Sequence, residues 1–365
     1  MTNNQVRIER QALVDFCAAT FVHLGLSTAD ARVAADVLVA ADARGIPSHG
    51  VARLQRYVNG LETGQMLPDA QEKVLADGPT SLVVHAQGGM GAPVSARTMT
   101  HIIDKAADTG AAFGCVRDSN HFGIAGYYAM MALEHDMLGI AMTNTAALGV
   151  PTFGRQVMFG TNPLAFAAPA DKEGAFVLDM STTVVTRGKI EVYERLEREL
   201  PAGWAVDRTG RSAHNPGSLL DDMFHRTGGG ILPLGGLGES FGGHKGYGLA
   251  VMVDILCGVL CGAPFGSDLA DTATSSGRVS HFFGAIRIDS YRQPAAFRRD
   301  MDRMLCELRT SPVAADAERV YYAGLKEREM EEECRKCGVP LAAKTWRQLQ
   351  EIAETQGIVP PLVRD

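Results

Sequence analysis

The chain of 365 residues has little of what marks a secreted, membrane-spanning or nucleic-acid-binding protein. Residues 1–7 carry no apolar run behind a basic start, so we expect no signal peptide. The net charge of -7 provides no basic surface for nucleic acid. The longest apolar stretch, residues 246–265, is rich in glycine and interrupted by Asp254. It is short for a membrane span and predicts a buried helix.

Cysteine is sparse and scattered, with seven residues, an odd number. This usage is typical of a reducing cytoplasm, so we expect a cytoplasmic protein. Cys334 and Cys337 have the CxxC spacing, but no second pair or histidine cluster follows them. They lie in a charged helical run that ends at Gly338, and we predict no metal site.

Apolar residues make up 46% of the chain and charged residues 21%, which is ordinary for a folded protein with a sizeable core. Apolar periodicity and a capping box at Ser27–Asp30 predict helices at both ends of the chain. The expected helices are 8–24, 28–43, 51–63, 295–309, 326–336 and 345–355. We expect residues 1–75 to form a helical domain and residues 293–365 to pack back on it.

The middle of the chain alternates short apolar strands with helices. Expected strands are 82–85, 114–117, 139–143, 164–168, 176–179 and 282–289. Expected helices are 92–108, 124–135, 184–200 and 247–261. This alternation predicts an α/β domain over residues 76–292. Residues 64–79 are predicted to be a linker, and the glycine-rich residues 201–246 a long functional loop.

The most informative motif is Ser48-His49-Gly50, in a tight loop before a predicted helix. His49, Arg53 and Tyr57 then fall at i, i+4 and i+8, on one face of that helix. Arginine pairs both oxygens of a carboxylate, and histidine moves a proton near neutral pH. The row therefore predicts a site for a small carboxylate. A histidine that merely caps the helix, followed by solvated arginines, is the alternative.

Gly88-Gly89-Met90-Gly91 follows a strand and precedes a helix, as a dinucleotide-binding turn does. The third glycine is missing, and no acidic residue ends a second strand about 20 residues on. Turn glycines are therefore favoured over a Rossmann site.

Four other segments carry groups that suit a cofactor. Asn120 and His121 lie between a strand and a helix, where free backbone N–H groups attract anions. Thr161 lies in a polar interruption of apolar sequence, and Asp179-Met180-Ser181 ends a strand with groups that suit a ribose. Lys245-Gly246 lies in a glycine-rich stretch that suits a pyrophosphate, although no Walker motif is present. An ordinary strand end or turn explains each segment alone about as well.

Taken together, these segments resemble the type-II malate/L-lactate dehydrogenase family, which is distinct from the Rossmann-fold lactate and malate dehydrogenases. The resemblance runs from the early helices to Gly338. The matching blocks occur in the family's order and are Arg44-Gly45-Ile46-Pro47-Ser48-His49-Gly50-Val51, Asn120-His121-Phe122-Gly123, Gly160-Thr161-Asn162-Pro163, Leu178-Asp179-Met180-Ser181-Thr182, Gly188-Lys189-Ile190, Gly203-Trp204-Ala205-Val206-Asp207 and Lys245-Gly246-Tyr247-Gly248-Leu249.

The resemblance implies a mixed α/β fold with a non-Rossmann NAD(P)-binding domain packed on a helical domain built from both chain ends. It also implies a homodimer that uses NAD or NADP, with NAD favoured. Members interconvert small (S)-2-hydroxy acids and 2-oxo acids, including malate, lactate, sulfolactate and ureidoglycolate. Other members reduce cyclic imino acids.

Carried onto this sequence, the resemblance makes His49 the general acid/base, assisted by Ser48, with His121 as a competing proton donor. Arg53 would clamp the substrate carboxylate, with Tyr57 and Thr161 also at the substrate. Lys189 is assigned to the catalytic set; imine reductases carry an acid at that position, which favours hydroxy-acid chemistry here. The residues implied in cofactor binding are His121, Phe122, Gly123, Ile124, Ala125, Asp179, Met180, Ser181, Lys245, Gly246, Gly324, Leu325 and Lys326. Leu325 departs from the family's usual acidic residue.

Two rival classes are weighed beside this one. Ser48 and His49 superficially suggest a hydrolase, but adjacent residues rarely orient as a catalytic dyad, and no nucleophile elbow is present. A non-catalytic binding protein would require all the polar blocks to be structural.

Overall fold

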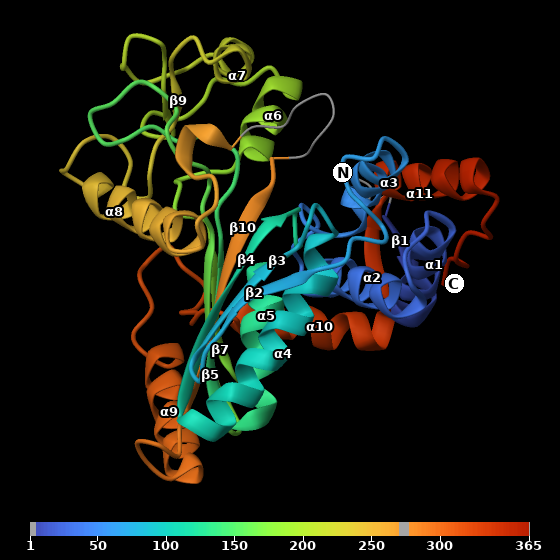
Figure 1. Ribbon diagram of the computed structural model, residues 1–365. Coiled ribbons are helices and arrows are strands. Elements are labelled where there is room, and N and C mark those ends of the chain that lie inside the picture. Colours follow the sequence, from blue (N-terminus) through green and yellow to red (C-terminus); the bar gives the residue numbers. More distant parts are fainter. Residues whose placement is uncertain (1–4, 270–276, 365) are drawn as a thin grey trace.

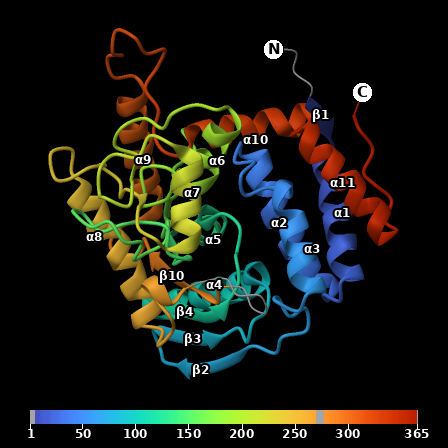
Figure 2. The same ribbon diagram turned by 90° about the horizontal axis from the view of Figure 1, so that it is seen from above.

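The computed structural model describes residues 5–269 and 277–364 (Figure 1). Residues 1–4, on which the expectation about a signal peptide partly rests, lie outside these ranges. The chain forms a helical unit from both of its ends, a central sheet, and a smaller unit at one end of the sheet (Figures 1 and 2). Within the described residues, no helix combines the length and the apolar content that crossing a bilayer requires.

The helical unit joins segments far apart in the sequence. Its helices are α1 (Arg10–His23), α2 (Thr28–Ala43), α3 (Leu54–Glu62), α10 (Leu325–Cys337) and α11 (Ala343–Gln356). Strand β1 (Gln5–Ile8) pairs antiparallel with β11 (Val339–Ala342) and ties the two ends together. Sequence analysis missed both strands, because four residues whose pairing partner lies over 300 positions away carry no local signal of their own.

The central sheet has seven strands in the order β2-β3-β4-β10-β5-β6-β7. Only β3 and β4 are parallel, and the other neighbours are antiparallel. A Rossmann sheet is mostly parallel, so the predicted non-Rossmann α/β fold is confirmed. The strands are β2 (Lys73–Asp77), β3 (Ser81–His85), β4 (Ala111–Ser119), β5 (Met137–Thr143), β6 (Leu164–Ala168), β7 (Phe176–Met180) and β10 (Val279–Arg287).

Helices cover both faces of this sheet (Figure 1). Helices α4 (Gly91–Thr109) and α5 (Ala125–Met131), the latter extended by a 3-10 turn (Ala132–His135), pack on one face. Helix α8 (Gly243–Asp254), which continues as a π-helical segment (Ile255–Val259), packs on the other. The core between the sheet, α4, α5 and the helical unit is continuous, with Phe122, Tyr128 and Phe283 among its largest fully buried side chains. Helix α8 and its π-helical segment pack on the sheet through a separate apolar cluster.

Two expectations about secondary structure and packing are wrong. Strand β2 occupies part of the predicted linker; all five of its residues are exposed, so this edge strand lacks the apolar alternation that marks a half-buried strand. Helix α9 (Pro294–Arg309) does not return to the N-terminal helices. It packs at the far end of the sheet through Leu305 against Ala170, and its Asp302 accepts backbone N–H groups of residues 171–173 (Figure 1).

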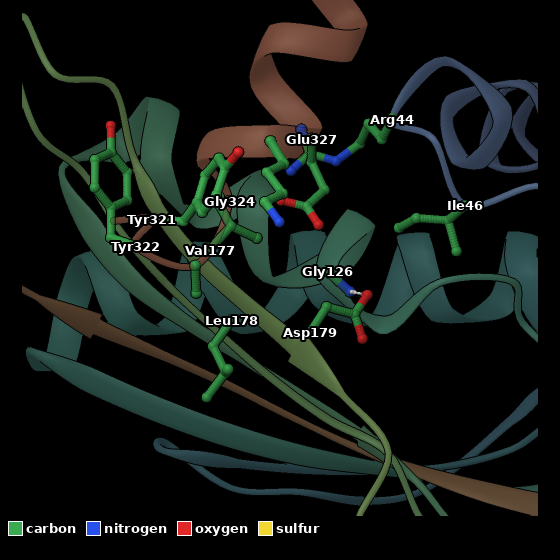
Figure 3. Close-up of a pocket in the computed structure, with 12 residues that line it drawn as sticks. Arg44, Ile46, Gly126, Val177, Leu178, Asp179, Tyr321, Tyr322, Gly324 and Glu327 are labelled. Carbon is green, nitrogen blue, oxygen red and sulfur yellow. Dashed lines mark hydrogen bonds between the residues drawn. The ribbon is translucent and has the colours of Figure 1, made fainter. Parts of the chain in front are cut away.

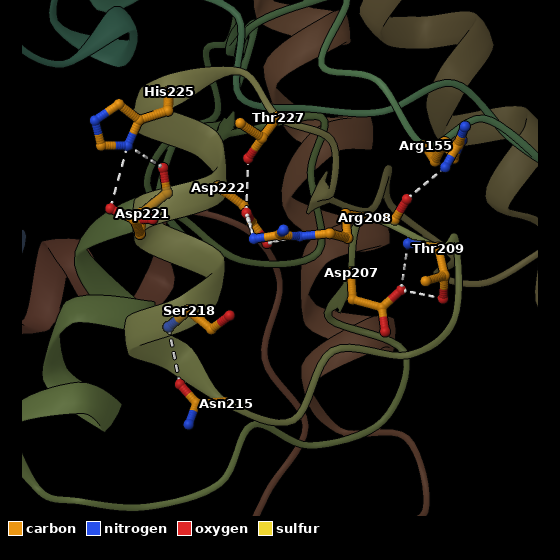
Figure 4. Close-up of polar contacts among 10 residues, drawn as sticks. All are labelled: Arg155, Asp207, Arg208, Thr209, Asn215, Ser218, Asp221, Asp222, His225 and Thr227. Carbon is orange, nitrogen blue, oxygen red and sulfur yellow. Dashed lines mark hydrogen bonds and ion pairs between the residues drawn. The ribbon is translucent and has the colours of Figure 1, made fainter.

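The predicted long loop is also wrong, because residues 184–246, together with residues 147–157, form a small unit with a core of its own. It holds α6 (Arg187–Arg195), β8 (Ala205–Val206), α7 (Pro216–His225) and β9 (Gly230–Ile231). Asp222, only 3% exposed, accepts hydrogen bonds from Arg208 and Thr227 and so joins α7 to the loop after β8 (Figure 4). The cap of α7, Asn215 followed by Pro216, was a readable helix-start signal.

Candidate active site

A buried carboxylate at the end of α2 holds the loop that carries His49. Asp42, at the end of α2 and 4% exposed, accepts the N–H of Val51 at 2.6 Å. A Cβ on Gly50 would lie 2.2 Å from this carboxylate, so only glycine fits between Asp42 and the loop. Burial raises the pKa of Asp42 to about 7, and the Val51 hydrogen bond opposes that rise. Asp42 was not predicted as a site residue, because nothing in the sequence distinguishes it from the other aspartates of the same helix.

Ser48, His49 and Arg53 lie together at the mouth of this loop. The Ser48 hydroxyl is 2.9 Å from Nδ1 of His49, and Nε of Arg53 donates to the Ser48 carbonyl at 2.7 Å. The chain enters the helix through a 3-10 turn (Val51–Arg53) before α3 begins at Leu54. Burial, and then the Arg53 charge, lower the pKa of His49 to about 4, so its imidazole is neutral at pH 7.

The predicted row on one helix face does not include His49, which precedes the 3-10 turn that begins at Val51. The role predicted for Tyr57 at the substrate stays a prediction. This side chain is only 3% exposed, and its hydroxyl lies 2.6 Å from Nδ1 of His121. Burial raises the pKa of Tyr57, so the hydroxyl stays protonated and donates. The N–H of Gly123 also points at Nδ1, at 3.2 Å. Neutral His121 therefore carries its proton on Nε2.

The two histidines that sequence analysis kept as competitors are neighbours. Their rings stack with centroids 5.6 Å apart and an angle of 23° between planes. Burial, followed by the nearby His49 and Arg53, holds the pKa of His121 well below its ordinary value. Two stacked imidazoles beside a guanidinium cannot both be positively charged at neutral pH, so the pair carries at most one positive charge.

A cavity of about 270 Å³ lies between β7, α5 and the start of α10 (Figure 3). Asp179 points toward it and accepts the N–H of Gly126 at 2.7 Å. Burial raises the pKa of Asp179 to about 6, with that hydrogen bond and Arg44 opposing. The lining residues are Arg44, Ile46, Gly126, Val177, Leu178, Asp179, Tyr321, Tyr322, Ala323, Gly324, Lys326 and Glu327.

Short segments of the chain connect the lining of this cavity to the two histidines. Gly126 follows His121 by five residues, and Ile46 precedes His49 by three. Sequence analysis did not assign Arg44, which is 8% exposed and paired with Glu331 at 3.0 Å, or Ile46 to the cofactor. Their position beside the His49 loop was the available signal.

The residues predicted to bind cofactor divide into three groups. Asp179, Gly324 and Lys326 line the cavity, and the Lys326 ammonium lies over the Tyr321 ring at 3.7 Å. Phe122, Ile124, Ala125 and Leu325 are buried residues, and their predicted roles in cofactor binding stay predictions. Gly123 continues from His121 toward α5, and the half-buried Met180 and Ser181 end and follow β7.

Four predicted site residues are not brought to this cavity. Lys245 and Gly246 lie at the start of α8, on the opposite side of the sheet from α10 (Figures 1 and 2). Thr161 donates its N–H to the Thr145 hydroxyl at 3.0 Å. Lys189 is exposed on α6. Their assigned roles stay predictions. Among the described residues, no three His, Cys, Asp or Glu side chains gather as a metal site.

Comparisons with known proteins agree with this geometry. The profile of the family described as malate/L-lactate dehydrogenase matches residues 8–350. Malate dehydrogenase from Pyrococcus horikoshii is 41% identical over 355 residues, 97% of each chain, and its solved structure has a TM-score of 0.88, covering 98% of this chain and 97% of that one. Malate/(S)-sulfolactate dehydrogenase from Methanothermus fervidus is 35% identical, covering 92% of this chain and 94% of its own.

A third relative is known by its crystal structure. Malate dehydrogenase from Entamoeba histolytica has a TM-score of 0.93 at 30% identity, with 98% of this chain and all of that chain covered. Similarity over nearly the whole chain to dehydrogenases excludes the two rival classes, a hydrolase and a non-catalytic binding protein. The mixed sheet, the helical unit made from both chain ends and these matches lead to one conclusion: the chain belongs to the malate/L-lactate dehydrogenase family, and it is an oxidoreductase.

Proposed function

We propose that this protein is a cytoplasmic, NAD-dependent dehydrogenase that interconverts a small (S)-2-hydroxy acid and its 2-oxo acid, with malate or lactate type substrates. The observation that carries the proposal is the Ser48–His49–Arg53 group beside His121, joined by short chain segments to the Asp179 cavity. His49 would move a proton, Arg53 would hold the substrate carboxylate, and the cavity suits a nucleotide.

The cavity's chemistry fits a dinucleotide. Asp179 presents a half-buried carboxylate beside the first turn of α5, and a carboxylate in such a place suits a ribose hydroxyl. Glu327 adds a second carboxylate to a lining that also holds Lys326 and Arg44, the latter paired with Glu331. The two carboxylates would repel an added 2′-phosphate, which supports NAD over NADP. A bound nicotinamide would accept or supply the hydride.

The protein's own residues would act as follows. In oxidation, neutral His49 takes the proton of the substrate hydroxyl, while the Ser48 hydroxyl at its Nδ1 holds the ring orientation. Arg53 donates a hydrogen bond from its Nε to the Ser48 carbonyl, and this leaves its two terminal nitrogens to pair with a carboxylate. His121, with Nδ1 occupied by Tyr57, presents an Nε2–H donor that stabilises charge on the substrate oxygen.

Reduction of a cyclic imino acid, the alternative within the family, is disfavoured by Lys189. The resemblance places an acid at this position in the imine reductases, where an acid would stabilise a positively charged iminium. A lysine offers no such stabilisation, and hydroxy-acid chemistry forms no iminium.

The test is a spectrophotometric panel. NADH and NADPH are each followed with pyruvate, oxaloacetate, further 2-oxo acids and a cyclic imine. We expect NADH to be consumed with a 2-oxo acid and the imine to be turned over far more slowly. Consumption of neither cofactor with any compound would contradict an active dehydrogenase, and preference for NADPH would contradict the role given to the two carboxylates.

We also propose a homodimer. The π-helical end of α8 exposes Ile255, Val259 and Leu260, each at least half exposed, with Phe265 at 48%. A contiguous apolar face of this kind is costly in water unless a partner covers it. Sedimentation velocity should show a dimer that Leu260→Glu with Val259→Glu dissociates, whereas Leu308→Glu on α9, also an exposed leucine, should leave it intact. A wild-type monomer at micromolar concentration would refute the dimer.

A further inference from the structure

The glycine turn that resembles a dinucleotide-binding motif has its polar groups engaged by the protein. Asn120 is 1% exposed, and its side-chain amide donates to the carbonyls of Gly88 at 2.8 Å and Gly89 at 2.9 Å. The N–H groups of these two glycines donate to the carbonyls of Asp118 and Ala86. A phosphate-binding turn offers free N–H groups instead. The turn therefore holds an asparagine and not a phosphate.

The fourth residue of the motif contacts the backbone of the same segment. A Cβ added to Gly91 would lie 2.0 Å from the carbonyl oxygen of Asn120 and 2.8 Å from that of His121. The first residue of α4 thus packs directly on the two peptide groups that flank His121. No side chain can occupy this position unless those peptides move.

Asn120 keeps this arrangement although one of its own atoms goes unpaired. Within the described residues, its buried Oδ1 has no hydrogen-bond partner. The amide cannot be turned over, because Oδ1 would then face two carbonyl oxygens. A buried acceptor without a partner is unfavourable, and the two hydrogen bonds that Asn120 donates to the glycine turn oppose that cost.

We propose that Gly88–Gly91 and Asn120 form a bracket that positions His121 for catalysis. The bracket holds the His121 backbone from the side of β3 and α4, while Tyr57 holds the ring from the side of α3. Together they set the stacking of His121 on His49. Asn120 is a positioning residue, since it acts through His121. The expected effect on kcat rests on the proposed function, whereas the expected effect on the position of His121 rests on the geometry alone.

The experiment compares Asn120→Asp, Asn120→Ala and Gly91→Ala with Gly139→Ala. Gly139 is a matched control, because a Cβ there would lie 1.9 Å from the Ala129 carbonyl oxygen, an equally severe backbone clash. Asn120→Asp keeps the shape but replaces the donating amide with a carboxylate oxygen, an acceptor, that faces two carbonyl oxygens. For each variant, Tm, kcat, KM and the 15N signals of the imidazoles of histidine-labelled protein are measured, with His121→Gln assigning the His121 signals.

We expect the Asn120 variants and Gly91→Ala to lower kcat about 10- to 100-fold, to change KM little, and to shift the His121 nitrogen signals. Gly139→Ala should lower Tm comparably and leave kcat and the His121 signals at their wild-type values. Wild-type His121 signals in both Asn120 variants would overturn the bracket. Equal loss of kcat in Gly139→Ala at a matched Tm would do so too. The imidazole signals report even if no substrate is turned over, so failure of the proposed function is seen separately.

Discussion

Replacing His49 with alanine is expected to lower kcat about 10²- to 10⁴-fold, because the variant has no group at the mouth of the loop to exchange the substrate proton. Substrate KM should change little, since Arg53 and its bond to the Ser48 carbonyl do not depend on the imidazole. Steady-state kinetics with the best 2-oxo acid of the panel measures both quantities. His101→Ala, an exposed histidine on α4, serves as the control and should retain wild-type turnover.

Turnover at the wild-type rate in His49→Ala would move the proton role to His121. The stacking of the two rings makes such a transfer of roles physically reasonable. The double variant His49→Ala with His121→Gln separates the cases, because two independent groups would give additive losses and one coupled pair would not.

The pH dependence of the same reaction follows from the direction of the His49 shift. Burial and Arg53 lower its pKa to about 4, whereas an ordinary histidine titrates near about 6.5. Reduction needs protonated His49, so its kcat/KM should rise about tenfold per pH unit as the pH falls from 8 to 5. Oxidation needs neutral His49, so its kcat/KM should be flat above pH 5. A break near about 6.5 in both directions would contradict this assignment.

Replacing Arg53 with lysine is expected to raise the KM of the 2-oxo acid about 10- to 100-fold, with a smaller fall in kcat. A lysine keeps the charge but cannot give a carboxylate two parallel hydrogen bonds, and losing one hydrogen bond to a charged group costs about 1.5–3 kcal/mol. Lysine also loses the bond from Nε to the Ser48 carbonyl. Initial rates over a range of substrate concentration give the KM.

The control for Arg53 is Arg32→Lys, an exposed arginine on α2 that pairs with Asp15. Its KM should match the wild type, and the cofactor's Kd should be unchanged in both variants. Arg53→Ala adds an electrostatic readout, because removing the cation should raise the pKa of His49 and move the reduction profile to higher pH. An unchanged KM in Arg53→Lys would refute the carboxylate clamp.

Local sequence patterns predicted much of this protein for physical reasons that can be named. Strand β6 and helix α4 were predicted within a residue of their bounds, since each combines a clear apolar period with flanking glycine or proline. The Ser48-His49 loop and the Asn120-His121 segment stood out because polar groups there interrupt apolar elements. Edge strand β2 was missed because all of its residues are exposed, and the paired ends β1 and β11 were missed because their stability comes from partners distant in the chain.

The sequence by itself determined the mixed α/β class, the family and the two histidine segments, because these depend on local periodicity and on ordered blocks of residues. Only the tertiary structure decided what those residues do to one another. Tyr57, predicted to lie at the substrate, donates a hydrogen bond to His121, and the glycine turn is the partner of Asn120. Contacts between residues this far apart depend on how whole elements pack, and a period of two or 3.6 residues carries no record of that packing.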